Sequence, residues 1–186
     1  MGVALAEQAL ARGAEVTVVH AHLEVALPRG VKGVAVSTSE EMLRALLDAQ
    51  PTSHLILMAA AVADWRSVAP SDHKIRKNDQ PEHWEPRLGR TPDILGALVG
   101  AKNPGQVIVG FAAETDPDPQ VRESAARKKL SSKAPDAIVL NPVGERVGFG
   151  EVETEVTLIT ASPQSLTFEG TKSSVAGRLL DALPEL

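Results

Sequence analysis

Three short apolar runs constrain the fold of this chain more than any other feature. Residues 53–59, 106–111 and 136–140 are nearly continuous in apolar and β-branched side chains, and each run is bounded by glycine, proline or polar residues. Such runs are typical of parallel strands that are covered on both faces. Helical patterns separate them, so the sequence predicts an α/β fold, a doubly wound and mostly parallel sheet with helices on both faces.

The remaining elements follow from periodicity and from residues that start or stop helices. Gly13 is a good C-cap for a first helix, and Thr38-Ser-Glu-Glu41 has the form of a capping box. Thr91 is predicted as an N-cap with Pro92 at the first helical position. Two runs near the C-terminus form a small strand pair that either closes the edge of the Rossmann-like sheet or pairs with a second subunit. The predicted helices span 2–12, 38–49, 91–101, 119–133 and 172–183, and the further strands span 15–20, 30–36, 155–160 and 165–169.

Length and composition favour a single domain, residues 1–186. Hydrophobic residues make up 43% of the 186, charged residues make up 23%, and no apolar run approaches the roughly 20 residues that a membrane helix needs. The absence of cysteine excludes disulfides and thiolate metal sites and favours the cytoplasm, and the first residues do not resemble a secretory signal. A net charge of −5 argues against nucleic-acid binding, so the expected partner is a small molecule.

Residues 64–90 form the longest stretch without a sustained period. The stretch contains prolines, two tryptophans and many charged residues. An irregular segment of this length inside a compact domain is usually functional or mobile. We therefore interpret residues 64–90 as a mobile flap.

Candidate ligand-binding residues follow the first apolar run. In a doubly wound sheet, ligands bind outside the carboxyl ends of the strands. Small side chains at Ala60 and Ala61 let a ligand approach the backbone, and Asp64 suits ribose hydroxyls or a magnesium ion. The alternative is that the alanines pack against a helix and that Asp64 caps a turn.

The second and third runs end in further candidates. Phe111 is placed to stack on a base, and Glu114 to meet a metal or an amine. The alternative puts Phe111 in the core and makes Glu114 a cap of the next helix. Asn141 ends the third run, where an asparagine forms a turn more often than it binds a ligand.

Cationic side chains that suit phosphate groups occur in two clusters. Lys74 and Lys77 lie in the flap, either as solvated charges or as contacts to a triphosphate. Lys129 and Lys133 are spaced i and i+4 on a predicted helix and can reach one phosphate; the alternative is favourable charge at a helix C-terminus. The stretch 91–95 opens a helix whose free amides suit an anion, although capping alone explains it equally well.

The order and spacing of these motifs resemble one family, the CTP-dependent phosphopantothenate:cysteine ligases (phosphopantothenoylcysteine synthetases) of bacterial coenzyme A synthesis. The family pattern runs A-A-V-A-D-aromatic, K-I-K-K, P-D-I-(V/L), G-F-A-A-E-T, A-R-x-K with a second lysine four residues on, and a strand ending in asparagine. Matching residues occur here at 60–65, 74–77, 92–95, 110–115, 126–133 and 141, so the resemblance covers nearly the whole chain. It implies nucleotide contacts at Ala60, Asp64, Lys74, Pro92, Asp93, Ile94, Leu95, Phe111, Lys129 and Lys133, with Ala61, Lys77, Glu114 and Asn141 as further candidates.

The resemblance also implies a reaction. In the family, the carboxylate of 4′-phosphopantothenate attacks the α-phosphate of CTP with loss of pyrophosphate. The amine of cysteine then attacks the acyl-cytidylate and releases CMP. Lys74 is the expected catalytic residue, stabilising charge in the second step, with Mg²⁺, Lys129 and Lys133 on the phosphates. The metal ligands are unknown, because the histidines show no metal-ligand spacing.

Partners and boundaries follow from the same resemblance. Family members are dimers, so a homodimer is expected, and a flavin-dependent decarboxylase is the expected fused or separate partner. Members also begin with a strand and a loop like N-x-S-S-G-K before an M-G-x-A-L-A helix, whereas this sequence begins with Met1-Gly-Val-Ala-Leu-Ala. The first strand of the sheet and its loop are therefore expected to be absent from the 186 residues.

Two other functions are compatible with the predicted fold. One is an NAD(P)- or flavin-dependent oxidoreductase, which the absence of a G-x-G-x-x-G fingerprint disfavours. The other is a non-catalytic nucleotide-binding module, which the absent N-terminal loop favours.

Overall fold

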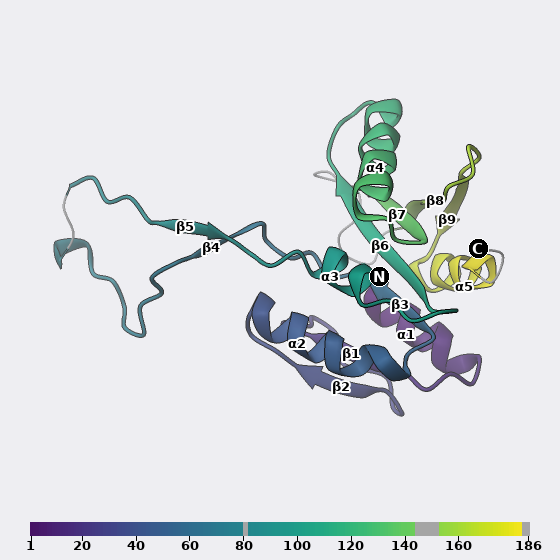
Figure 1. Ribbon diagram of the computed structural model, residues 1–186, viewed down its shortest axis with the longest axis horizontal. Coiled ribbons are helices and arrows are strands. Elements are labelled where there is room, and N and C mark those ends of the chain that lie inside the picture. The colour runs from purple at the N-terminus through teal and green to yellow at the C-terminus, as the bar shows by residue number, and fades with distance from the viewer. Residues whose placement is uncertain (80–81, 144–152, 184–186) are drawn as a thin grey trace.

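The computed structural model describes residues 1–79, 82–143 and 153–183, and its centre is a five-stranded sheet (Figure 1). The strand order is β3-β6-β7-β8-β9, in which β3, β6 and β7 are parallel while β8 and β9 are antiparallel to their neighbours. The predicted α/β fold is confirmed, and the C-terminal strand pair closes one edge of the sheet within the same chain. The bounds are β3 Leu55–Met58, β6 Val107–Glu114, β7 Ala137–Pro142, β8 Thr154–Ile159 and β9 Leu166–Gly170.

Helices cover both faces of this sheet. α1 (Gly2–Ala11) and α5 (Lys172–Ala182) pack on one face, and α2 (Ser39–Ala49), α3 (Ile94–Gly100) and α4 (Pro119–Lys133) pack on the other. Neighbouring residues of one strand serve the two clusters, because successive side chains of a strand point to opposite faces. In β6, Val109 belongs to the α1/α5 cluster and Ile108 to the other, and both are fully buried.

Two of the predicted helix ends are confirmed. Gly13, just beyond α1, has a φ of +83°, a conformation that favours glycine. The Thr38 hydroxyl accepts a hydrogen bond from the backbone N–H of Glu41, and the Glu41 carboxylate accepts one from the backbone N–H of Thr38, which completes the capping box of α2.

A second parallel sheet consists of two strands only. β1 (Thr17–His20) pairs with β2 (Lys32–Ala35), and α2 packs against β1. Within the described ranges, neither strand pairs with the five-stranded sheet.

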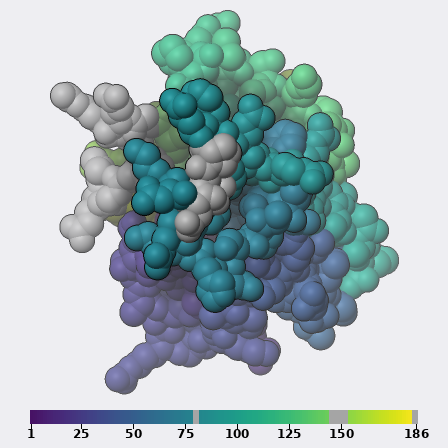
Figure 2. Space-filling view, turned by 90° about the vertical axis from the view of Figure 1, so that its left-hand side faces the viewer, coloured from purple at the N-terminus to yellow at the C-terminus, as the bar shows by residue number. Residues whose placement is uncertain are grey.

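The predicted flap contains a short antiparallel ribbon and extends away from the body of the molecule (Figure 1). We call residues 64–79 and 82–90 the arm. β4 (Trp65–Ser67) pairs with β5 (Leu88–Arg90), and a single 3₁₀ turn, η2 (Lys77–Asp79), lies farther out. Figure 2 looks at the molecule from the arm's side, with the teal residues of the arm in front of the body. β4 and β5 were not predicted from the sequence, because three-residue strands are too short to show alternation.

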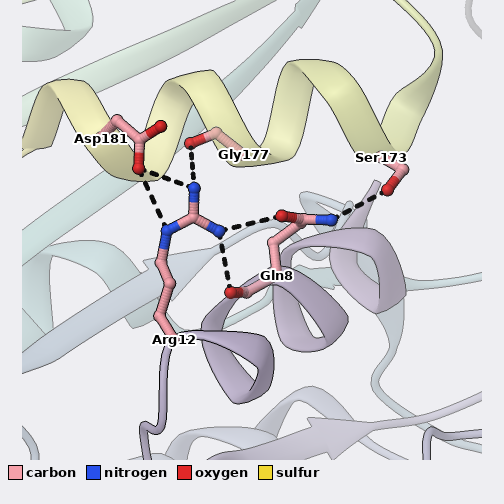
Figure 3. Close-up of polar contacts among 5 residues, drawn as sticks. All are labelled: Gln8, Arg12, Ser173, Gly177 and Asp181. Atoms are coloured by element: carbon pink, nitrogen blue, oxygen red, sulfur yellow. Dashed lines mark hydrogen bonds and ion pairs between the residues drawn. The ribbon is translucent and has the colours of Figure 1, made fainter.

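Polar contacts on the surface join the first and last helices (Figure 3). The Arg12 guanidinium donates to Oδ1 of Asp181 from both Nε and Nη2, and to the carbonyl oxygens of Gly177 and Gln8. The Gln8 amide donates to Ser173 Oγ at 3.0 Å. These groups are exposed, with 65% of the Asp181 side chain accessible, so solvent screens the pair.

A buried amide pair lies at the amino ends of β3 and β6. Gln50, in the 3₁₀ turn η1 (Gln50–Thr52), is 2% exposed and Gln106 is 4% exposed. Gln106 Nε2 donates to the carbonyl oxygens of Gln50 and Ser53, and Gln50 Nε2 donates to Gln106 Oε1 and to the carbonyl oxygen of Leu98. The pair therefore satisfies backbone carbonyls that α2, α3 and β3 leave inside the protein.

We predict that Gln106→Leu lowers the free energy of unfolding by about 2–4 kcal/mol, because several buried polar groups lose their partners while the volume is retained. Arg12→Ala, which removes an exposed cluster, should cost less than about 1 kcal/mol. Urea denaturation followed by circular dichroism measures both. Equal losses would mean that burial does not set the strength of these contacts.

Candidate functional site

A cavity of about 520 Å³ lies beyond Met58, the last residue of β3, and beside Phe111 of β6. The start of α3, the end of α4 and the root of the arm form its other walls. This is the region in which doubly wound sheets bind ligands. The lining residues are Met58, Ala60, Val62, Asp64, Trp65, Arg90, Thr91, Pro92, Asp93, Ile94, Leu95, Phe111, Lys129 and Lys133.

Most of the predicted site residues meet in this cavity. Of the ten residues expected to contact nucleotide, all except Lys74 line it. Their contacts with nucleotide stay a prediction. The lining is completed by five residues that are not among the expected nucleotide contacts: Met58, Val62, Trp65, Arg90 and Thr91.

Both lysines of α4 already have partners in the protein. Lys129 Nζ donates to the carbonyl oxygen of Phe111 at 2.6 Å, and Lys133 Nζ lies 2.6 Å from Asp93 Oδ2. Burial, and secondarily the charge of Lys133, lowers the pKa of Lys129 below its ordinary value, although the carboxylates of Glu114, Asp64 and Asp93 act in the opposite direction. The two lysines therefore form a positively charged wall whose positions are fixed before any ligand arrives.

Asp93 both caps α3 and pairs with a lysine of this charged wall. Its Oδ1 accepts a hydrogen bond from the backbone N–H of Gly96 at 3.1 Å, and its Oδ2 meets Lys133. Burial alone would raise the pKa of Asp93, but the hydrogen bonds from Lys133 and Gly96 and the charges of the two lysines outweigh burial, so the pKa is lowered.

The prediction that Thr91 caps α3 is wrong. The N-cap is Asp93, and α3 begins at Ile94. Thr91 instead joins the two sides of the arm's root, because its backbone N–H donates to the carbonyl oxygen of Asp64 at 3.0 Å and its hydroxyl donates to that of Ala63 at 2.6 Å. Since Thr and Asp are both good caps, the choice depended on the start of the helix, which the sequence left uncertain by about two residues.

The root of the arm is also attached to α2. Arg66 Nε lies 2.6 Å from Glu40 Oε1, in the first turn of α2. This contact and those of Thr91 hold Asp64 and Trp65 at the cavity. The exposed alanines Ala60 and Ala61 precede them, but only Ala60 lines the cavity.

The structure does not bring Lys74 and Lys77 to the cavity. Both are exposed residues of the arm beyond β4, and neither belongs to the lining. The catalytic role expected for Lys74 therefore requires the outer arm to meet a reacting group, and it stays a prediction.

Glu114 and Asn141 do not line the cavity. The prediction's alternative role for Glu114 as a helix cap is wrong, because the N-cap of α4 is Asp118. Asn141 pairs with Ala113 across β6 and β7, and its Oδ1 is buried with no hydrogen-bond partner among the described residues.

The described part of the chain contains neither a candidate metal cluster nor a candidate membrane-spanning helix. No group of three or more His, Asp or Glu side chains there lies close enough to hold a metal ion. No described helix is both long enough and apolar enough to cross a bilayer.

Comparisons with known proteins place this chain in a recognised domain family. The family model "DNA/pantothenate metabolism flavoprotein C-terminal domain" matches residues 1–186. The coenzyme A biosynthesis bifunctional protein CoaBC of Mycobacterium tuberculosis is 37% identical over 191 residues, which cover 98% of this chain and 45% of that protein. The chain thus spans about half the length of this relative.

Solved structures share the fold. The C-terminal domain of a coenzyme A biosynthesis bifunctional protein CoaBC superposes with a TM-score of 0.78 and 29% identity, covering 99% of this chain and 80% of that one. A Cab2 mutant in complex with phosphopantothenate-cysteine has a TM-score of 0.74 and 16% identity over 99% of this chain and 76% of that one. At that identity the second likeness concerns the fold alone.

We predict that Asp93→Asn lowers the pKa of Lys129 further. The substitution removes a negative charge that raises this pKa, while burial and the charge of Lys133 remain. The asparagine still accepts the hydrogen bond from Gly96, so α3 should keep its cap. A ¹³C NMR titration of the lysine Cε resonances measures the shift, with Asp48→Asn on the exposed face of α2 as control. An unchanged Lys129 titration in Asp93→Asn would contradict the electrostatic coupling.

Proposed function

Because the chain belongs to the DNA/pantothenate metabolism flavoprotein C-terminal domain family, we propose that it is the ligase domain that joins 4′-phosphopantothenate to L-cysteine in coenzyme A biosynthesis. CTP activates the substrate carboxylate as an acyl-cytidylate with release of pyrophosphate. Cysteine then gives 4′-phosphopantothenoylcysteine and CMP.

The observation that carries the proposal is the composition of the cavity. Its small residues near the end of β3 leave the backbone accessible, Phe111 offers an aromatic ring, and Lys129 and Lys133 offer positive charge. A nucleotide needs these three features, for its sugar, base and phosphates respectively. Within the described cavity, no residue favours the oxidoreductase over the ligase.

In the first step an oxygen of the substrate carboxylate attacks the α-phosphorus of CTP, and the bond to pyrophosphate breaks. Negative charge grows on the leaving pyrophosphate, where Lys129 and Lys133 would neutralise it. In the second step the cysteine nitrogen attacks the acyl carbon, loses a proton and displaces CMP. Lys74 would stabilise the charge of that step once the arm reaches the site.

Mg²⁺ is the metal that we propose for this site. Magnesium usually binds one or two carboxylates together with substrate phosphates. Asp64 fits this role, because it lines the cavity and makes no ion pair with a described residue, whereas Asp93 is engaged by Lys133. The ion would neutralise phosphate charge.

We also propose that the chain acts as a homodimer. The outer arm and β5 expose Val68, Ile75 and Leu88 at 43%, 45% and 55%. Exposed apolar side chains gathered on a projecting segment are typical of protein interfaces. Contact with a second copy would cover them and offer a surface against which Lys74 can be positioned.

The sheet topology supports the expectation of an additional strand. A strand inserted between β1 and β3 would join the two parallel sheets in the order β2-β1-x-β3-β6-β7, which is the doubly wound 3-2-1-4-5-6 order. We propose that the family's first strand takes this position. The flavin-dependent decarboxylase proposed as the partner, fused or separate, would precede it.

The ligase proposal is tested by incubating the protein with CTP, Mg²⁺, 4′-phosphopantothenate and cysteine, and by measuring pyrophosphate and CMP. Both products should appear, and omission of cysteine should leave pyrophosphate formation but suppress CMP. ATP and NADPH serve as comparisons. If neither the protein nor a variant extended before Met1 by a strand and loop of the family pattern forms either product, the proposal fails.

We predict that Lys74→Gln slows amide formation by about 100-fold while pyrophosphate release in the absence of cysteine continues, because the lost charge acts on the second step. Lys32→Gln, which removes the same charge from an exposed position of β2 outside the cavity lining, is the matched control and should keep the parent's rate. Unchanged turnover in Lys74→Gln would exclude Lys74 from the mechanism.

Mixing two single variants determines which subunit of the proposed homodimer supplies Lys74 to a site. If Lys74 acts in the partner's site, Lys74→Gln mixed with Lys129→Gln should regain activity, since one hybrid site keeps both lysines. If Lys74 acts in its own subunit's site, the mixture should remain inactive.

A further inference from the structure

Arg90 differs from the other cationic residues of the cavity. Lys129 donates to a backbone carbonyl and Lys133 pairs with Asp93. Arg90 lines the same cavity, yet its guanidinium makes no hydrogen bond or ion pair with any described residue. Its N–H donors are therefore open to a ligand.

The position of Arg90 is set by the arm's root. Trp65 and Arg90 are direct partners in the β4–β5 ribbon, and the guanidinium carbon lies 5.8 Å from the centre of the Trp65 ring. Thr91, the next residue, is hydrogen-bonded to Asp64 and Ala63. A guanidinium that rests on an aromatic face keeps the N–H groups along its edge free, and it loses less rotational freedom on binding.

We propose that Arg90 is a phosphate-binding residue of this site, positioned by Trp65 on the wall that the arm's root forms. The inference rests on the proposed ligase function and deepens it. A guanidinium matches a phosphate group with two parallel N–H···O bonds, which a lysine cannot form. The cavity would then have two cationic walls, one from Lys129 and Lys133 on α4 and one from Arg90.

Two phosphate-bearing reactants follow from the proposed function, and they share this chemistry. One is the nucleoside triphosphate, and the other is the phosphate monoester of the pantothenate substrate. The monoester and the reacting carboxylate are at opposite ends of phosphopantothenate, so a site for that reactant needs a cation away from the one at the reacting phosphate.

Direct binding tests the proposal without requiring turnover. Trp65 and Trp84 are the two tryptophans, and Trp84 lies outside the cavity lining. Trp84→Phe leaves Trp65 as a single fluorescent reporter in contact with Arg90. Inorganic pyrophosphate, CTP and 4′-phosphopantothenate are titrated separately into this protein and into its Arg90→Gln, Arg90→Lys and Arg87→Gln variants, with isothermal calorimetry as a second readout.

We expect Arg90→Gln to weaken the binding of at least one of the three probes by tenfold or more, since charge-assisted hydrogen bonds are lost. Arg90→Lys keeps the charge but loses the two parallel N–H donors, so its affinity should lie between those of the parent protein and of Arg90→Gln. Arg87→Gln removes the same charge just before β5, outside the cavity lining. Its affinities should stay within twofold of those of the parent protein. Affinities within twofold for all probes in Arg90→Gln, or no binding by the parent, overturn the proposal. A fall in thermal stability without a change in affinity would overturn it too, because Arg90 would then only support the arm.

Steady-state assays identify the reactant. A rise in KM for CTP alone assigns Arg90 to the triphosphate, and a rise in KM for phosphopantothenate alone assigns it to the monoester. If the parent protein catalyses no reaction but Arg90→Gln still loses pyrophosphate binding, the ligase function fails while the phosphate site stands.

Discussion

The burial of β6 on both faces is the constraint on which the other layers depend. Val109 packs toward α1 and α5, and Ile108 packs toward α2, α3 and α4. On the same face as Ile108, Gly110 allows α3 a close approach, since a Cβ there would lie 2.7 Å from side-chain carbons of both Leu95 and Ile138. The same strand that fills the core therefore sets the distance of α3 from the sheet, and with it one wall of the cavity.

Asp93 transmits this arrangement to the charges of the site. A carboxylate that caps α3 is fixed in direction by the helix, and here the same carboxylate fixes Lys133 on α4. Gly96 makes the double role possible, because a Cβ at that position would lie 2.7 Å from Asp93 Oδ2. One side chain thus links the cap of α3 to the position of Lys133 and to the electrostatic potential of the cavity.

The sequence predicted the features that depend on local pattern or on motif order. Buried strands such as 136–140 are predicted by their continuous apolar residues. The i, i+4 spacing of Lys129 and Lys133 is enough to predict that they share a helix face. Arg90 had no such signal, because it meets Trp65 through a three-residue pairing that closes the loop 68–87. The distance of Lys74 from the cavity could not be predicted from the sequence either. The direction in which the arm leaves the body depends on tertiary contacts, such as that of Arg66 with Glu40.

The cations of the cavity differ in what a phosphate must displace. A phosphate that binds Lys133 competes with Asp93, and one that binds Lys129 competes with the Phe111 carbonyl oxygen. Part of the free energy of each new contact is therefore spent on replacing an existing one. Arg90 gives up only water, because Trp65 contacts the guanidinium through its ring and uses none of its N–H donors. The net gain from a hydrogen bond is the difference between the new and the old partner. By that measure the arm's root offers a phosphate the larger gain per contact, and the α4 lysines contribute chiefly through their combined charge.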